Sequence, residues 1–391
     1  MAEPPLKGIR VIELARILAG PWAGQLLADL GADVIKVESP DGGDDTRKWG
    51  PPFVMSHDGE NLSAAYYHSC NRGKRSIAVD FSRSEGADTL RKLVATADVL
   101  IENFKLGGLK KYGLDYESLK AINPRLVYCS ITGFGQDGPY APRAGYDFII
   151  QAMAGMMSIT GEAGREPQKA GVAISDLFTG LYSVVAIQAA LRHAEKTGEG
   201  QHIDMALYDS QISALGNQNL NYLVSGKSPV QMGNAHMNIA PYEVLPVRDG
   251  HIILAVGNDG QFGKFCAAVD LTDLPANPDF ATNPARVANR VKLRARIVET
   301  LATLDRDPLL AKLEAAGVPA SPINTIGQMF ADPQTIARGM RLDLDDGHGN
   351  RLPSVRAPMV MSGTPLVYER PSPRLGEHTD EILAELERAA K

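Results

Sequence analysis

One acidic residue, Asp176, stands in the apolar stretch GVAISDLFTGLYSVVAIQAAL at residues 171–191, and residues 177–191 carry no charge. An ionised carboxylate in apolar surroundings is costly unless another group stabilises it or the protein uses it chemically. Aspartate is a good N-cap, so Asp176 could begin the helix that follows, or it could pair with a distant cation. It could also be a nucleophile. A carboxylate at a helix N-terminus among small residues can attack an acyl group beside backbone N–H donors.

Basic residues gather in the first third of the chain, next to strand ends and glycine-containing turns. The set consists of Arg47, Lys48, Arg72, Lys74, Arg75, Lys105, Lys110 and Lys111. Open α/β sheets bind ligands at such edges, so the set as a whole favours a ligand that carries several phosphates. Each residue alone is equally compatible with solvated surface charge, which is the expectation for Lys110.

The common catalytic signatures are missing from this sequence. The first predicted strand–helix turn reads ARILAGP and lacks the G-x-G-x-x-G fingerprint of dinucleotide binding, although Glu38 follows at about the required 20 residues. The chain contains no Walker A sequence, no G-x-S-x-G and no H-E-x-x-H. The cysteines Cys70, Cys129 and Cys266 show no metal-binding spacing, so we expect no metal site. Phosphoryl transfer, serine hydrolysis and zinc hydrolysis are therefore not indicated.

The elements that must position Asp176 follow an α/β pattern. Strands are predicted at residues 9–14, 32–38, 75–81, 98–104, 125–135 and 202–207. Helices are predicted between them, for example at residues 22–31 and 86–97. Strands that alternate with helices indicate a Rossmann-like domain with a parallel sheet covered on both faces.

The pattern changes after residue 225, which predicts a large domain at 1–225 and a smaller α/β domain at 226–325. The smaller domain begins with a hairpin that turns at Asp249-Gly250. Two helices follow, opening at Asn283-Pro284 and Asp307-Pro308. Residues 326–391 are Pro-rich and then helical, and we expect them to return to the large domain.

Composition is that of an ordinary soluble globular protein. The 391 residues are 44% hydrophobic and 22% charged, with a net charge of −6. The acidic balance argues against a nucleic-acid or anionic-membrane surface. The uncharged runs are shorter than the roughly 20 residues that span a bilayer, and the N-terminus lacks a secretory signal pattern. With no disulfide framework indicated, we expect a cytoplasmic protein.

Several stretches resemble the class III (CaiB/BaiF) CoA-transferases along nearly the whole chain. They are LAGPWAGQLLADLGADVIKVESPDGGDDTR, NRGKRSIAVDF, VLIENFKLGGLKKYGL, YCSITGFGQDGP, RAGYDFIIQAMAGMMSITG, GVAISDLFTG, GVPASPIN and PRLGEHTDEIL. In that family the aspartate of the G-x-x-x-x-D-x-x-[TS]-G stretch is the nucleophile, which here is Asp176. The resemblance implies an interlocked homodimer of Rossmann-like chains, with the active site between the domains and near the partner chain.

The resemblance also implies how CoA binds. CoA enters as the thioester substrate, and no cofactor is held permanently. The positions that match the family's CoA contacts are Leu18, Ala19, Val79, Asp80, Asn103, Phe104, Lys105 and Lys111, and Tyr146 matches a tyrosine close to the thioester.

Departures from relatives narrow the expected chemistry. The racemases of the superfamily carry His-Asp where this chain has Tyr146-Asp147, and tyrosine is a poor base at neutral pH. Oxalate-using members carry glutamine in place of Leu18. The segments GGDDTRKWGPPF and AHMNIAPYEV are similar in sequence to those of the succinyl-CoA–glutarate transferase branch of the family. This similarity implies that the substrates are an acyl-CoA and short dicarboxylic acids. The alternatives are a 2-methylacyl-CoA racemase or a catalytically silent CoA-binding protein.

The second carboxylate of a dicarboxylic acid needs a cation or hydrogen-bond donors. Arg47 is the first candidate, because its planar fork suits a bidentate contact with a carboxylate. Arg16 and His236 are the next candidates.

Overall fold

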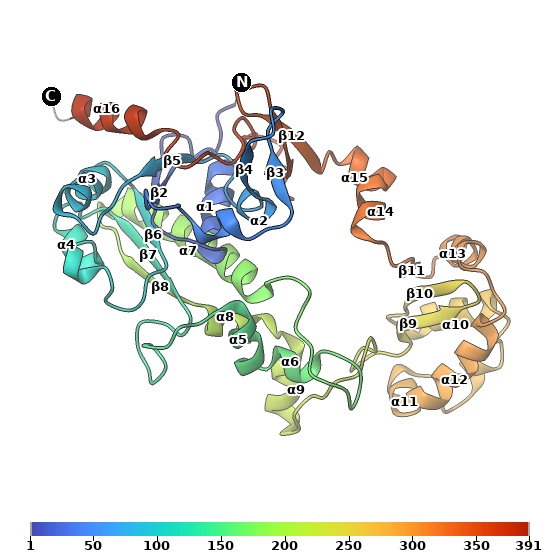
Figure 1. Ribbon diagram of the computed structural model, residues 1–391. Helices are drawn as coiled ribbons and strands as arrows, with labels where there is room; N and C mark the ends of the chain where they lie inside the picture. Colours follow the sequence, from blue (N-terminus) through green and yellow to red (C-terminus); the bar gives the residue numbers. More distant parts are fainter. Residues whose placement is uncertain (1, 390–391) are drawn as a thin grey trace. The chain divides into compact units, whose positions relative to one another are not determined.

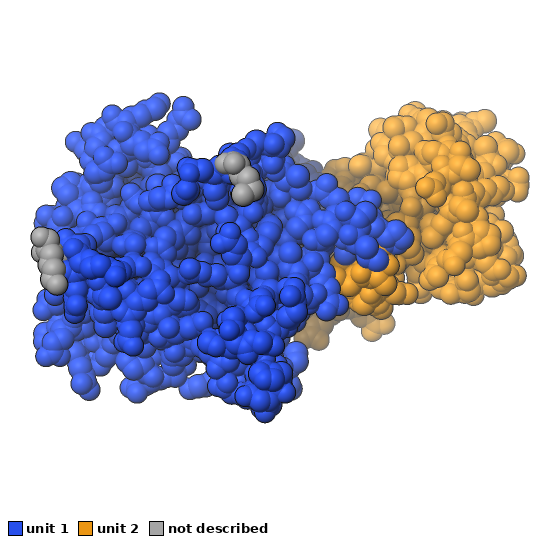
Figure 2. Space-filling view, turned by 90° about the horizontal axis from the view of Figure 1, so that it is seen from above, with its two compact units in different colours: residues 1–156, 170–225, 333–391 blue, residues 157–169, 226–332 orange. Residues whose placement is uncertain are grey.

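The chain divides into two compact units (Figure 2). The computed structural model describes residues 2–389. Unit 1 contains residues 1–156, 170–225 and 333–391, and unit 2 contains residues 157–169 and 226–332. Two boundaries differ from the sequence-based ones. Residues 157–169 group with unit 2, and the last segment joins unit 1 from residue 333 onwards, not from residue 326.

Unit 1 is built on a parallel sheet, as the alternating pattern predicts. Over the described residues it has six strands in the order β5-β2-β1-β6-β7-β8, and each neighbouring pair is parallel. The strands are β1 (Arg10–Glu13), β2 (Asp33–Glu38), β5 (Arg75–Ala78), β6 (Val99–Glu102), β7 (Val127–Thr132) and β8 (His202–Ala206). The strand order reverses direction between β1 and β6. Ligands of such sheets bind outside the carboxyl ends of the strands at this switch point.

Helices cover both faces of this sheet (Figure 1). Successive residues of a strand face opposite sides, so Val11 joins one hydrophobic core while Ile12 joins the other. The first core includes residues of α1 (Ala19–Asp29), α5 (Asp147–Met153), α7 (Ile174–Thr197) and α8 (Leu207–Ala214). The second core includes residues of α3 (Ser84–Ala95), α4 (Tyr116–Lys120) and α16 (Thr379–Ala389).

Helix α7 is long and apolar enough to cross a bilayer by length and composition alone. It reaches 24 residues because it continues through a charged last turn beyond the apolar run. Val184, Ile187 and Leu191 belong to the first core, beside residues of α1 and the sheet. Core helices of soluble proteins pass the same test, so this observation is weak evidence for a membrane span.

Unit 2 has its own hydrophobic core and contains the predicted hairpin, in which β9 and β10 pair antiparallel across Asp249-Gly250. Helix α11 begins where Thr282 accepts a hydrogen bond from the N–H of Ala285. The elements of unit 2 are β9 (Tyr242–Val247), β10 (Gly250–Ala255), α10 (Asp259–Ala268), η3 (Leu274–Ala276), α11 (Asn283–Ala288), α12 (Arg290–Leu301), α13 (Arg306–Ala315), β11 (Ala320–Ser321) and α14 (Ile326–Ala331).

Some smaller elements were not expected from the sequence. Two hairpins form in segments for which no strand was predicted, β3 with β4 and β12 with β13. The remaining elements are η1 (Asp45–Lys48), β3 (Phe53–Met55), β4 (Asn61–Ala64), α2 (Ala65–His68), η2 (Lys110–Tyr112), α6 (Met156–Ile159), α9 (Asn217–Ser225), α15 (Pro333–Ala337), β12 (Arg341–Asp345) and β13 (Arg351–Val355).

Candidate active site

A cavity of about 640 Å³ lies in unit 1 at the switch point of the sheet. Its walls come from the turns that follow β1, β5, β6 and β7, together with residues 141–146 and the start of α7. Parallel strands bring their carboxyl ends to one edge, so turns far apart in sequence meet there. The cavity therefore occupies the edge at which the sequence predicted a ligand.

Most of the residues singled out in the sequence line this cavity together. They are Arg16, Leu18, Ala19, Val79, Asp80, Asn103, Phe104, Lys105, Lys111, Tyr146 and Asp176. Arg47 and His236 are not among the lining residues. The structure thus brings the predicted nucleophile and every predicted CoA contact to one place.

Asp176 is neither the cap of α7 nor part of an ion pair. The helix begins two residues earlier, at Ile174, with Ala173 at the N-cap position, so Asp176 lies inside the first turn. The N–H of Ser175 instead donates to the Oδ1 of Asp147 at 2.8 Å. Within the described residues, no hydrogen-bond donor or cation contacts the Asp176 carboxylate. Over residues 2–389 of this chain, neither an N-cap role nor an ion pair accounts for the carboxylate.

Burial, together with the smaller effect of the nearby charge of Asp147, raises the pKa of Asp176 to about 7. The charge of Asp176 also acts on Tyr66. Burial and, after it, this charge raise the pKa of the Tyr66 phenol to about 12. Near neutral pH the Asp176 carboxylate is consequently about half ionised and poorly stabilised. This is the state expected of a reactive group.

The start of α1 lies beside Asp176. Gly180 is one helical turn after Asp176, and a Cβ added to it would stand 2.8 Å from the carbonyl oxygen of Ala19. Only glycine allows α7 to approach α1 so closely. The N-cap residue of α1 is Leu18, which makes no side-chain cap hydrogen bond, and the first turn carries no acidic residue. Its backbone N–H groups can therefore stabilise negative charge in the cavity.

The structure contradicts the expected role of Arg47. The side chain is buried, and its Nε and Nη2 donate to the two carboxylate oxygens of Glu38 at 2.8 and 2.7 Å. Further bonds go to Ser63, to the Tyr67 hydroxyl and to the carbonyl of Pro373. The bidentate fork that suggested a substrate contact is used inside the protein, so Arg47 is a structural residue.

Three other basic residues of the cluster are also internal. Arg72 pairs with Asp29 at 2.6 Å, Lys74 with Glu13 at 2.8 Å and Arg75 with Asp33 at 2.7 Å, and all three cations are buried. Only Lys105 and Lys111 of the original set reach the cavity. Arg47 and these three cations are thus paired inside the protein, so the predicted ligand with several phosphates is left with Lys105 and Lys111.

Arg143 also lines the cavity, although it was not predicted from the sequence. Its guanidinium lies 4.0 Å from the ring centroid of Tyr140 and forms no ion pair with any residue that the structure describes. Arg16, by contrast, already pairs with Asp45 at 2.9 Å. Arg143 follows a proline in a loop, and no periodicity or spacing marks it as a ligand residue. An uncommitted guanidinium in a cavity suits a carboxylate or phosphate.

His236 belongs to unit 2. Its ring packs edge-on against Tyr242, with centroids 5.3 Å apart, and its Nδ1 accepts a hydrogen bond from the N–H of Asn238 at 3.1 Å. Its carbonyl oxygen accepts a hydrogen bond from Arg290. A role for His236 in acceptor binding stays a prediction.

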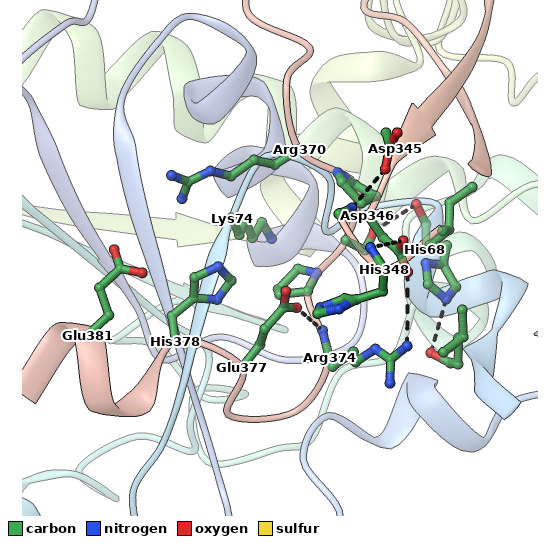
Figure 3. Close-up of a pocket in the computed structure, with 16 residues that line it drawn as sticks. His68, Lys74, Asp345, Asp346, His348, Arg370, Arg374, Glu377, His378 and Glu381 are labelled. Carbon is green, nitrogen blue, oxygen red and sulfur yellow. Dashed lines mark hydrogen bonds and ion pairs between the residues drawn. The ribbon is translucent and has the colours of Figure 1, made fainter. Parts of the chain in front are cut away.

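A second cavity in unit 1, of about 300 Å³, shares no lining residue with the first among those described. Figure 3 shows charged side chains of both signs around it, including Lys74, Arg370, Arg374, Glu377 and Glu381. Arg374 is bound to Glu60 at 2.8 Å, and Lys74 is bound to Glu13. Across residues 2–389, no group of three or more His, Cys, Asp or Glu side chains is placed to hold a metal ion.

Comparisons with known proteins agree with this geometry. The profile of CoA-transferase family III matches residues 6–379. A succinate–glutarate CoA-transferase from Agrobacterium fabrum is 64% identical over 386 residues, covering 98% of this chain and 96% of that protein. A human succinyl-CoA:glutarate CoA-transferase is 42% identical over 383 residues, covering 98% and 86%. The crystal structure of a CaiB/BaiF family protein from Brucella suis is 61% identical and superposes with a TM-score of 0.88, covering 99% of this chain and all of that one. The chain belongs to the family III (CaiB/BaiF) CoA-transferases.

Proposed function

We propose that this protein moves CoA between short dicarboxylic acids, with succinyl-CoA as a donor, through a thioester on Asp176. The observation that carries the proposal is the unpaired Asp176 carboxylate in a cavity that also holds the positions expected to contact CoA. The names of the relatives from Agrobacterium fabrum and human support the choice of acids.

The mechanism is a sequence of acyl exchanges. An Asp176 carboxylate oxygen attacks the thioester carbonyl, the C–S bond breaks, and a mixed anhydride and CoA thiolate form. The thiolate attacks the Asp176 carbonyl carbon, which releases the donor acid as a carboxylate and leaves Asp176 as a CoA thioester. The acceptor carboxylate then attacks that carbon and displaces the thiolate, which finally attacks the acceptor's acyl carbonyl. One bond forms as one breaks in each step, and Asp176 is regenerated.

The cavity supplies what these steps need. Each tetrahedral intermediate carries an oxyanion, and the N–H groups at the start of α1 can stabilise it. Lys105 and Lys111 can hold CoA phosphates away from the reacting carbon. Binding energy from the nucleotide then keeps the released thiolate beside the anhydride during the exchange.

Trapping the intermediate tests this function. Protein incubated with succinyl-CoA and hydroxylamine should acquire a hydroxamate at Asp176, visible by peptide mass spectrometry, and should form new CoA thioesters when glutarate is added. A CoA-binding protein without catalysis would acquire no hydroxamate. A racemase would exchange an α-proton of a 2-methylacyl-CoA with solvent and would need no acceptor acid. Either of those results would overturn the proposal.

Arg143→Met should weaken transfer more than Arg16→Met does. Arg143 brings a guanidinium with no carboxylate partner into the cavity, whereas Arg16 is already neutralised by Asp45. A lost charged hydrogen bond corresponds to a rise in KM of roughly 10- to 100-fold. A rise for glutarate but not for butyrate would place Arg143 at the distal carboxylate, and a rise for every CoA thioester would place it at a phosphate. An unchanged KM in all assays would contradict both roles.

The interlocked homodimer is also part of the proposal. Helices α5, α7, α8 and α9 expose many apolar side chains. These side chains are Phe148, Ile149, Met153, Leu181, Val185, Ile212, Leu220, Leu223 and Val224. An exposed apolar face of this kind on unit 1 is suited to burial by a second copy of the chain. Sedimentation should therefore show a dimer at nanomolar concentration, and two differently tagged dimers should not exchange chains without denaturant. A monomer, or rapid exchange, would rule out interlocking.

We further propose a cytoplasmic location. Cys70, Cys129 and Cys266 are buried and unpaired, which fits a reducing compartment.

A further inference from the structure

Ile17 has a backbone conformation that its side chain disfavours. Its φ is +73°, in the left-handed region that β-branched residues very rarely adopt. The residue lies in the turn after β1, directly before Leu18 at the N-cap of α1, and it lines the cavity around Asp176. Strained residues persist only when their surroundings hold them, and they concentrate at functional sites.

The backbone on both sides of Ile17 is held by side chains from other segments. The Ile17 N–H is shared between Asp44 Oδ1 and Oδ2, each at 3.3 Å. The Ile17 carbonyl accepts a weak hydrogen bond from the Cys70 thiol at 3.6 Å. Asn103 accepts from the Arg16 N–H at 2.9 Å and donates to the Arg16 carbonyl at 2.7 Å. Among the described contacts to the backbone of Arg16 and Ile17, the contact from Asp44 is the charged one.

Asp44 is itself held rigidly. It is fully buried, pairs with Lys36 Nζ at 2.9 Å, and accepts from the backbone N–H and the hydroxyl of Thr46. Lys36 also donates to Glu13, the last residue of β1, and to the carbonyl of Ala15 in the turn that follows. Burial alone would raise the pKa of Asp44, but the Lys36 charge and the Thr46 bonds outweigh it and lower that pKa to about 2. The carboxylate is therefore ionised at every working pH.

We infer that Asp44 is a positioning residue, whose carboxylate holds Ile17 in the left-handed conformation and so fixes Leu18 and Ala19 beside Asp176. The inference rests on the proposed function, in which the N–H groups of that turn stabilise charge on the reacting centre. Asp44 is not among the residues that line the cavity. Its effect on the reaction passes through the shape of the turn.

A double-mutant cycle tests this inference. Asp44→Asn should lower kcat by roughly 5- to 150-fold, which is the range that corresponds to the conformational cost of one strained residue. The KM for succinyl-CoA should change less. Glycine adopts a φ of +73° without steric cost. In an Ile17→Gly background, the same Asp44→Asn change should therefore lower kcat by less than about threefold, because the turn no longer needs the carboxylate. Equal losses in the two backgrounds would overturn the inference.

Two further variants keep the test decisive. Thr46→Val removes one bond to Asp44 and repeats the cycle more mildly if Asp44→Asn does not fold. Asp29→Asn is the matched control, since Asp29 is also a buried carboxylate, lies at the end of α1, pairs with Arg72 and does not line the cavity. It should reduce stability and leave kcat unchanged. If Asp44→Asn behaves as this control does, Asp44 is structural only. Hydroxamate formation at Asp176 is read separately, so failure of the proposed function would be recognised independently.

Discussion

Replacement of Asp176 by alanine is expected to abolish CoA transfer and leave the fold intact. The change removes the carboxylate that carries first the acyl group and then CoA in the proposed mechanism, so the loss should reach at least roughly 10⁴-fold in kcat. Stability should not fall, because no described side chain depends on the Asp176 carboxylate for a hydrogen bond or ion pair. Steady-state kinetics with succinyl-CoA and glutarate, together with thermal unfolding, measure the two effects. Residual turnover above a few per cent would contradict the covalent route.

The pH dependence gives a second measurement on the same residue. Its pKa in the folded protein is about 7, above the 3.8 of an unperturbed aspartate. The ionised form is the nucleophile, so the rate of thioester formation should rise with pH and level off above about 7. The free energy of unfolding should change in the opposite direction and fall as the pH rises. Folding disfavours the ionised form, so the carboxylate destabilises the protein increasingly from about pH 4 to pH 7.

Asp176→Asn should consequently be more stable than the natural protein at pH 8, and the difference should shrink at pH 5. Asp147→Asn is the comparison variant, because it removes the neighbouring negative charge but keeps Asp176. It should shift the acidic limb of the rate profile to lower pH. A profile that stays in place would show that Asp147 does not influence the nucleophile.

The main features of the site could be predicted from short stretches of sequence. Apolar strands that alternate with helices indicate the parallel sheet, and the carboxyl ends of its strands give the ligand edge. Asp176 was identifiable because its local sequence contains no partner for a charge. The hairpin at Asp249-Gly250 could also be predicted locally, because the Asp-Gly turn and the two strands that it joins lie within a few residues of each other.

Ion pairs could not be predicted in this way, because their partners come from distant segments. Arg47 is held by Glu38, Tyr67 and the Pro373 carbonyl, which span more than 300 positions. Glu38 stood where an acidic residue could bind a ribose, yet it serves this pair. A charged side chain has the same sequence signal whether its partner is a substrate phosphate or a buried carboxylate. Arg143 is the opposite case: its side chain has no carboxylate partner among the described residues, and nothing nearby in the sequence indicates this.

Arg47→Met should therefore destabilise the fold and leave acceptor choice unchanged. Removing the guanidinium leaves Glu38 as a buried carboxylate whose remaining described donors are the Ser76 hydroxyl and the N–H of Asp44. Breaking a buried ion pair from one side costs about 3–5 kcal/mol of unfolding free energy. Denaturant unfolding measures this loss. The ratio of kcat/KM for succinate to that for butyrate should match that of the natural protein, because Arg47 does not line the cavity.

The loss in Arg47→Met should also depend on pH. Burial alone would raise the pKa of Glu38, but Arg47 and Lys36 outweigh it and hold that pKa below its usual 4.5. A depressed carboxyl pKa contributes stability above pH 4.5 that is lost as the pH falls. In the variant Glu38 can take up a proton instead, so the stability difference from the natural protein should be larger at pH 8 than at pH 5.

Arg16→Met provides the matched arginine control for the stability measurement. Its pair with Asp45 is half exposed, and pairs of that kind contribute less than about 1 kcal/mol. A double variant, Arg47→Met with Glu38→Gln, should recover part of the lost stability, since the buried charge is then removed from both sides. If Arg47→Met instead kept full stability and lost selectivity for dicarboxylic acids, the buried pair would not form in solution and Arg47 would return to the substrate site.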